Sequence, residues 1–93
     1  MIYRQKYRDR IDIICQVLEA ASGDYTKKTR IMSKAFLSHS QLNRYLRVLT
    51  PGELISYDSG AQTYKTTEKG IRFLDIHNQM DEMIKVPTDL GSR

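Results

Sequence analysis

KKTRIMSKAFLSHSQLNRYLRVLTPGELISYDSGAQTYKTT is the sequence of residues 27–67, and its hydrophobic periodicity changes once, at Pro51-Gly52. Before this dipeptide, apolar residues recur every three or four positions, which is typical of amphipathic helices. After it, two short runs rich in Ile, Tyr and Thr flank the turn-forming residues 58–61 (DSGA), which is typical of a β-hairpin. Residues 27–67 therefore predict helices followed by a hairpin.

Two helices are expected before the hairpin, at residues 27–35 and 38–50. Thr26 is a candidate N-cap of the first. Ser38, followed three positions later by a glutamine, matches a capping box and predicts the start of the second. Pro51 cannot continue a helix, so the second must end near residue 50. The two large apolar residues between the helices, Phe36 and Leu37, are expected to form an apolar turn that locks the helices together.

Helical spacing also occurs on both sides of this stretch. Residues 8–22 place Ile11, Ile14, Cys15, Leu18 and Ala21 on one face, and Gly23 is well placed to end that helix. A last helix is expected from residue 67 to about residue 85, capped by one of the two threonines at its start. The sequence Val-Pro at 86–87 predicts its end.

The order helix, short helix, tight turn, helix, hairpin, long helix predicts a winged helix-turn-helix with an additional C-terminal helix. This is a mainly α fold with a small β-hairpin, of the α+β class. We expect a basic N-terminal arm (1–7), the winged helix-turn-helix domain (8–66, with its recognition helix at about 38–50 and its wing at about 53–66), a C-terminal dimerisation helix (67–85) and a disordered tail (86–93).

The chain has 93 residues, 40% of them hydrophobic and 28% charged, which are ordinary values for one small folded domain. Its net charge of +4 is unevenly distributed. Residues 1–50 hold ten Lys and Arg against four Asp and Glu, whereas residues 51–93 hold five against seven, so the two parts carry +6 and −2. A basic half joined to a mildly acidic half favours a polyanionic partner.

Several classes of site are not expected. The single cysteine, Cys15, has apolar neighbours, which predicts a buried, inert thiol in a reducing compartment and neither a disulfide nor a metal cluster. No apolar run approaches the roughly 18 residues that a membrane span needs, and the N-terminus lacks the apolar segment of a secretory signal. We therefore expect an intracellular, cytoplasmic protein that uses no cofactor, and no small-molecule ligand can be inferred.

Ser38-His39-Ser40 raises the question of a serine nucleophile with its base. Adjacent helical side chains point about 100° apart, and the helix at 38–50 contains no acid that could orient the imidazole. The capping box accounts for Ser38 without catalysis. The sequence therefore predicts no catalytic residue and no enzyme.

Three motifs carry a resemblance to a known family. They are KT-x-IM-x-KA-x-LS at 28–38, QL-x-x-YL at 41–46 and Y-x-TTEKG-x-x-FL at 64–74. Together they resemble small archaeal winged-helix proteins that are predicted transcriptional regulators, and the resemblance covers roughly residues 8–84. It implies double-stranded DNA as a partner, and dimerisation through an antiparallel coiled coil of the last helix.

The exposed face of the recognition helix is polar and basic. In helix-turn-helix proteins the early residues of this helix reach base edges, and Arg and Asn can each bind a purine through two hydrogen bonds. The expected base-edge contacts are His39, Ser40, Asn43 and Arg44, and the expected DNA-backbone contacts are Lys27, Lys28, Arg30, Lys34, Arg47 and Lys65. A solvated polar helix face is the alternative. The wing carries an acid and no base at its tip, so its contact with DNA is expected to be weak or made through Ser59, Gln62 and the flanking Lys65.

Two further contact surfaces are expected. The N-terminal cations Arg4, Lys6, Arg8 and Arg10 either form a DNA-binding arm or belong to a frayed tail. The last helix spaces apolar residues as in a coiled coil, at Phe73, Ile76, Met80 and Met83, and so predicts a homodimer interface. The expected function is a dimeric DNA-binding protein, a transcriptional regulator or a chromosome-associated protein. A winged helix that binds only partner proteins is the alternative.

Overall fold

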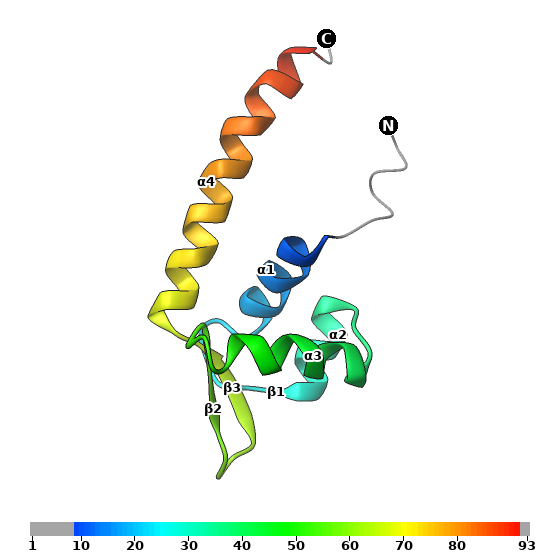
Figure 1. Cartoon of the computed structure of the whole chain (residues 1–93), viewed down its shortest axis with the longest axis vertical. Coiled ribbons are helices and arrows are strands. Elements are labelled where there is room, and N and C mark those ends of the chain that lie inside the picture. Colours follow the sequence, from blue (N-terminus) through cyan, green and yellow to red (C-terminus); the bar gives the residue numbers. More distant parts are fainter. Residues whose placement is uncertain (1–8, 92–93) are drawn as a thin grey trace.

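A computed structural model describes the backbone of residues 9–91 and the side chains of residues 9–83. The elements are α1 (Arg10–Ala20), β1 (Thr26–Lys27), α2 (Lys28–Ala35), α3 (His39–Leu49), β2 (Ile55–Asp58), β3 (Thr63–Thr66) and α4 (Glu68–Gly91). The predicted α+β class is confirmed. The β2–β3 hairpin and α4 leave the helical body in opposite directions (Figure 1). The strands form one antiparallel sheet in the order β1-β3-β2.

The hydrophobic core lies where α1, α2 and α3 meet the sheet and the start of α4. The largest fully buried side chains are Leu18, Ile31, Leu42, Leu49, Ile55 and Val17. In α1 the prediction was wrong for Ile11, which is 43% exposed, whereas Val17 and Ala20 are buried. Because α1 packs against both α2 and α4, its buried face is wider than one helical stripe and is turned away from residue 11.

The turn between α2 and α3 is set by backbone geometry. The capping box is confirmed, since the Ser38 hydroxyl accepts a hydrogen bond from the Gln41 N–H and the Gln41 side chain accepts one from the Ser38 N–H. Leu37 is buried as expected. Phe36 is 80% exposed, so the prediction that both residues pack in the turn was wrong for it. Its left-handed backbone (φ 56°) reverses the chain, and the side chain points outward.

The short strand β1 was not predicted. Thr26 pairs with Tyr64 and Lys27 pairs with Thr63, which adds a third strand to the hairpin. Thr26 is therefore not an N-cap; its hydroxyl donates to the carbonyl oxygen of Asp24 at 3.0 Å. Two residues are too few to produce a periodicity, and only pairing with a distant strand makes them a strand.

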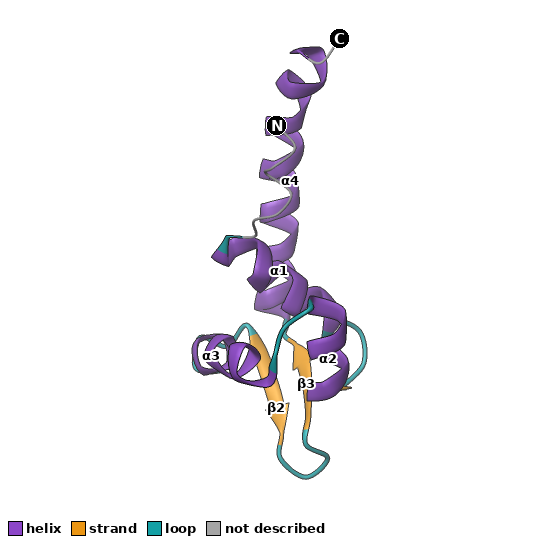
Figure 2. Cartoon of the chain, turned by 90° about the vertical axis from the view of Figure 1, so that its right-hand side faces the viewer, coloured by secondary structure: helices purple, strands orange, loops and turns teal. Residues whose placement is uncertain are grey.

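Two threonines connect the wing to the helices. Thr67 caps α4 as predicted, because its hydroxyl oxygen accepts a hydrogen bond from the Gly70 N–H at 3.0 Å. The same hydroxyl donates to the carbonyl oxygen of Glu53 at 2.6 Å. The buried Thr66 hydroxyl donates to the carbonyl oxygen of Leu18, also at 2.6 Å. These bonds tie the base of the wing to both α1 and α4 (Figure 2).

Helix α4 continues to Gly91, so the predictions that it ends near residue 85 and that a disordered tail follows were wrong for residues 86–91. Proline removes one backbone hydrogen bond from a helix, and its ring clashes with the carbonyl group four residues earlier, so it either ends a helix, as predicted here, or kinks it. In α4 the helix continues past residue 87. Residues 92–93, and the basic arm expected at 1–7, lie outside the described residues.

Cys15 is buried, as predicted. Burial raises the pKa of its thiol to about 11, and the acidic side chains of Glu19, Asp12 and Asp9 add to the rise. The thiol is therefore neutral at physiological pH and a poor nucleophile. Within the described part of the chain, no helix has the length and apolar character needed to span a membrane, and no group of His, Cys, Asp and Glu side chains is placed to hold a metal ion.

Candidate nucleic-acid interface

The segment that forms β1, α2 and α3 contains no acidic residue. Between Asp24 and Glu53 the chain contains six Lys and Arg and no Asp or Glu. This stretch forms β1, α2 and α3, so its positive charge is concentrated on one part of the fold. A local excess of cations without intervening acids attracts polyanions and raises their association rate.

Helix α3 presents a polar face opposite its buried one. Leu42, Leu46 and Leu49 are buried, and they hold the helix against the core. On the other side His39, Ser40, Arg44 and Arg47 are exposed, whereas Asn43 is half-buried. The residues predicted to read bases thus lie on one helix face, as their spacing required.

A chain of hydrogen bonds connects α2 to this face. The ammonium nitrogen of Lys28 lies 2.7 Å from Oδ1 of Asn43, and Nδ2 of Asn43 lies 3.3 Å from Nδ1 of His39. Lys28 is half-buried and is a cation of α2 that contacts α3. It was predicted only as a DNA-backbone contact, because sequence spacing did not reveal its approach to a residue fifteen positions later.

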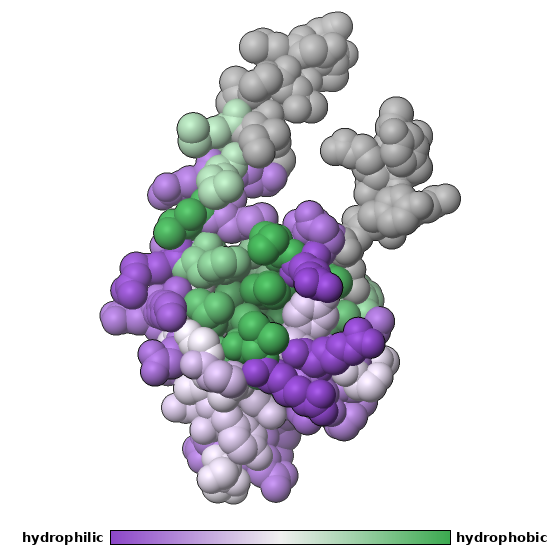
Figure 3. Space-filling model, viewed as in Figure 1, coloured by the Kyte–Doolittle hydropathy of each residue, from purple (hydrophilic) through white to green (hydrophobic). Residues whose placement is uncertain are grey.

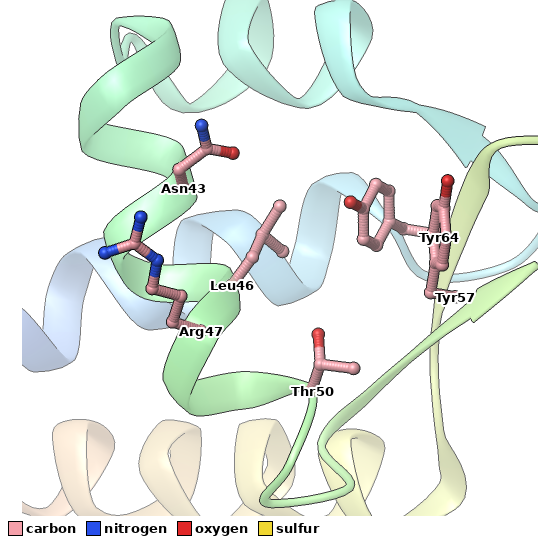
Figure 4. Close-up of a pocket in the computed structure, with 6 residues that line it drawn as sticks. All are labelled: Asn43, Leu46, Arg47, Thr50, Tyr57 and Tyr64. Carbon is pink, nitrogen blue, oxygen red and sulfur yellow. The ribbon is translucent and has the colours of Figure 1, made fainter. Parts of the chain in front are cut away.

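The wing side of α3 borders a shallow hollow of about 240 Å³. Asn43, Leu46, Arg47 and Thr50 line it from α3 and its C-terminal end, and Tyr57 and Tyr64 line it from the wing. Figure 4 shows the two tyrosines across the hollow from Asn43 and Arg47. Arg47 therefore borders the hollow from the side of the recognition helix.

Tyr57 and Tyr64 are direct partners on neighbouring strands. Their ring centroids are 4.7 Å apart and the rings are tilted by 38°. Burial raises the pKa of the Tyr64 phenol, and the nearby Tyr57 adds to the rise. The Tyr64 hydroxyl is therefore protonated at neutral pH. Tyr57 is 45% exposed and Tyr64 is half-buried.

Arg44 lies at the edge of the polar face of α3 that is nearer to α1. It lines a concavity of about 370 Å³ together with Arg10, Ile14, Tyr45, Val48 and Leu49, between α1 and α3. Arg44 and Asn43 were predicted to act together on base edges. Within the polar face of α3, Asn43 and Arg47 border the hollow beside the wing and Arg44 borders the concavity beside the start of α1.

A comparison with models of protein families shows the family of this chain. A model described as winged helix-turn-helix matches residues 7–85. The chain belongs to the winged helix-turn-helix family. Domains of this kind generally bind DNA and are typically not enzymes. A search of curated proteins finds no match.

Three further cations of this winged helix-turn-helix share their surface with acidic residues. Lys27, Arg30 and Lys34 line a concavity that also contains the acids Glu19 and Asp24. Their positive charge is therefore partly compensated, which the residue count of α2 alone could not show.

The wing has two different faces. Lys65 pairs with Ser56, one position away from the paired tyrosines, and so points to the opposite face of the hairpin. Its ammonium group lies 5.3 Å from the ring centroid of Tyr25. Ser59 and Gln62 are exposed at the tip, where Oδ1 of Asp58 accepts hydrogen bonds from two backbone N–H groups of the turn.

Proposed function

We propose that the chain binds double-stranded DNA, with α3 in the major groove and the wing beside it. The observation that carries this proposal is the acid-free polar face of α3, continuous with Lys28 of α2 and with the hollow that Arg47 lines. A helix fits the major groove of B-DNA, where each base pair presents a distinct pattern of donors and acceptors. A helix face that served only as solvated surface, the alternative interpretation, would not require several hydrogen-bond donors to lie together on it.

In this proposal His39, Ser40, Asn43 and Arg44 reach base edges from the exposed face of α3. Arg47 and Lys28 contact the phosphates that flank the groove. Ser59 and Gln62 make the weaker contacts of the wing. Lys27, Arg30, Lys34 and Lys65 contribute mainly through long-range attraction, because the first three share their surface with acids and the last lies on the far face of the wing.

Arg47→Ala tests the phosphate contact. We expect several-fold weaker binding to all duplex sequences, and a decrease of about 1 in the slope of log affinity against log salt concentration, because one counterion fewer is released. Mobility-shift titrations at several salt concentrations measure both quantities. The matched control is Arg72→Ala, which removes another exposed arginine, from α4, where it lies beside Glu53 and Glu68.

The control variant should bind DNA like the parent protein. Equal losses for both variants would show that only net charge matters and that α3 holds no specific position on the duplex. Binding of the parent protein weaker than about 10⁻⁴ M at low salt would contradict DNA binding altogether. That result would favour the alternative function, a winged helix that binds partner proteins.

The proposal includes a homodimer formed through α4. Ile76, Met80 and Met83 are 57%, 55% and 72% exposed, and they follow one another at four- and three-residue spacing. Figure 3 shows apolar surface that continues from the body of the protein along α4. Phe73, expected in the same stripe, is partly buried and packs against the core of its own chain. A second copy that covers the stripe would remove this apolar surface from water.

Ile76→Asp should convert the dimer to a monomer, because a carboxylate in an apolar interface loses its hydration without gaining a partner. Sedimentation at several protein concentrations measures the change. Asn78→Asp adds the same charge to an exposed position on the opposite side of α4 and should leave the dimer intact. An unchanged dimer in Ile76→Asp would exclude this stripe as the interface.

A dimer of this kind would suit a transcriptional regulator or a chromosome-associated protein of the cytoplasm. Two copies of α3 would then meet two half-sites, at a spacing fixed by the dimer geometry. Enrichment of bound sequences from a random DNA pool distinguishes the two roles. A regulator should enrich a defined site, whereas a general coating protein should enrich none.

A further inference from the structure

The side-chain amide of Asn43 is held from two sides. Lys28 contacts its oxygen at 2.7 Å and His39 contacts its nitrogen at 3.3 Å. Asn43 is half-buried in the middle of the exposed face of α3, and Lys28 is half-buried at the start of α2. A residue of the preceding helix therefore touches the centre of the proposed base-reading surface.

The ammonium group of Lys28 fixes the orientation of this amide. An ammonium group has three donors and no acceptor, so only the amide oxygen can bond to it. The opposite orientation would bring the NH₂ group of Asn43 against the ammonium, donor against donor. The NH₂ group consequently faces His39. In the neutral imidazole Nδ1 must then accept this hydrogen bond, and the ring proton is on Nε2.

The remaining hydrogen-bonding capacity of Asn43 matches one base. After these two contacts the amide keeps one oxygen lone pair and one N–H. Adenine presents a donor (N6) and an acceptor (N7) side by side in the major groove, whereas guanine presents two acceptors (O6 and N7). An amide held in this orientation satisfies adenine and meets guanine with its oxygen opposite O6, acceptor against acceptor. An amide that is free to turn can avoid this contact, because its NH₂ group can direct both hydrogens at O6 and N7 of guanine.

We propose that Lys28 is a positioning residue that fixes the orientation of Asn43 and thereby makes α3 select adenine over guanine at the base pair that Asn43 contacts. This inference rests on the proposed DNA binding and deepens it, since it assigns a sequence preference to one residue. Lys28 acts through Asn43 and needs no contact with the base. Two of its three donors stay available for a phosphate.

The tautomer of His39 tests the orientation in the free protein, without DNA. In the parent protein above pH 8, nitrogen NMR of the imidazole should show the proton on Nε2. Lys28→Met should give a mixture of both tautomers, because the amide can then turn over. Lys28→Arg should restore the parent pattern. A proton on Nδ1 in the parent protein, or a pattern unchanged in Lys28→Met, would overturn the orientation argument.

The preference for adenine over guanine tests what the fixed orientation of Asn43 does in DNA binding. A duplex selected by the parent protein from a random pool is compared with copies in which single adenines are replaced by guanine. At the adenine that Asn43 reads, Lys28→Met should lower the adenine-to-guanine affinity ratio about tenfold, the order of discrimination that a bidentate contact gives. Lys34→Met is the matched control: it removes the same charge from α2, beside Gln16 and Glu19 and away from Asn43.

The outcomes separate the two proposals. A lowered ratio in Lys28→Met, with the parent ratio in Lys34→Met and in Lys28→Arg, supports the positioning role. Equal ratios in Lys28→Met and Lys34→Met, with tight binding by both, overturn the positioning role and leave DNA binding standing. Failure of the parent protein to bind any duplex overturns the proposed function and the adenine preference together.

Discussion

Leu42→Ala should lower the free energy of unfolding by about 3 kcal/mol, the middle of the range for removing a fully buried leucine. Leu42 is 0% exposed and belongs to the inward face of α3, so its loss leaves a cavity between α3 and the core. The stability of a domain of this size is only about 5–15 kcal/mol. Urea unfolding followed by circular dichroism measures the decrease.

The control is Val48→Ala, on the same helix. Val48 is 65% exposed, and its truncation should change the stability by less than about 0.5 kcal/mol. If both variants lost the same stability, α3 would not be anchored through the face that contains Leu42. The polar face opposite could then not be assigned to the outside either.

Gly70→Ala should be destabilising by about 3 kcal/mol, at the upper end of the usual range for overpacking. A methyl group at this position would meet the backbone carbonyl oxygen of Leu54 and would lie 2.5 Å from Cγ2 of Thr66. A backbone atom cannot move aside as a flexible side chain can. The first turn of α4 would have to shift away from the base of the wing. Thermal or urea unfolding measures the loss.

Gly60→Ala provides the comparison for this second prediction. A methyl group at Gly60, in the turn of the wing, would lie 3.4 Å from Oδ1 of Asp58, an ordinary contact. Its effect on stability should stay below about 1 kcal/mol. A Gly70→Ala protein as stable as the parent would mean that α4 does not approach Leu54 as closely as the structure has it.

Local signals in the sequence predicted most of the elements. The capping box at Ser38, the helix-ending Pro51 and the turn residues at 58–61 act over a few positions, and α3 and the hairpin lie where these signals place them. The exposed face of α3 followed from helical periodicity in the same way. Strand β1 could not be predicted, because two residues become a strand only by pairing with β3.

The candidate site also has features that the sequence predicted and features that only the structure showed. The sequence alone determined which residues share the outer face of α3, since helical geometry fixes that from spacing. Only the tertiary structure decided that Arg47 borders the hollow beside the wing, that Arg44 borders the concavity beside α1 and that Lys28 contacts Asn43. These placements depend on how separate elements pack, and packing depends on contacts between residues far apart in the chain. A local sequence pattern therefore cannot predict these contacts.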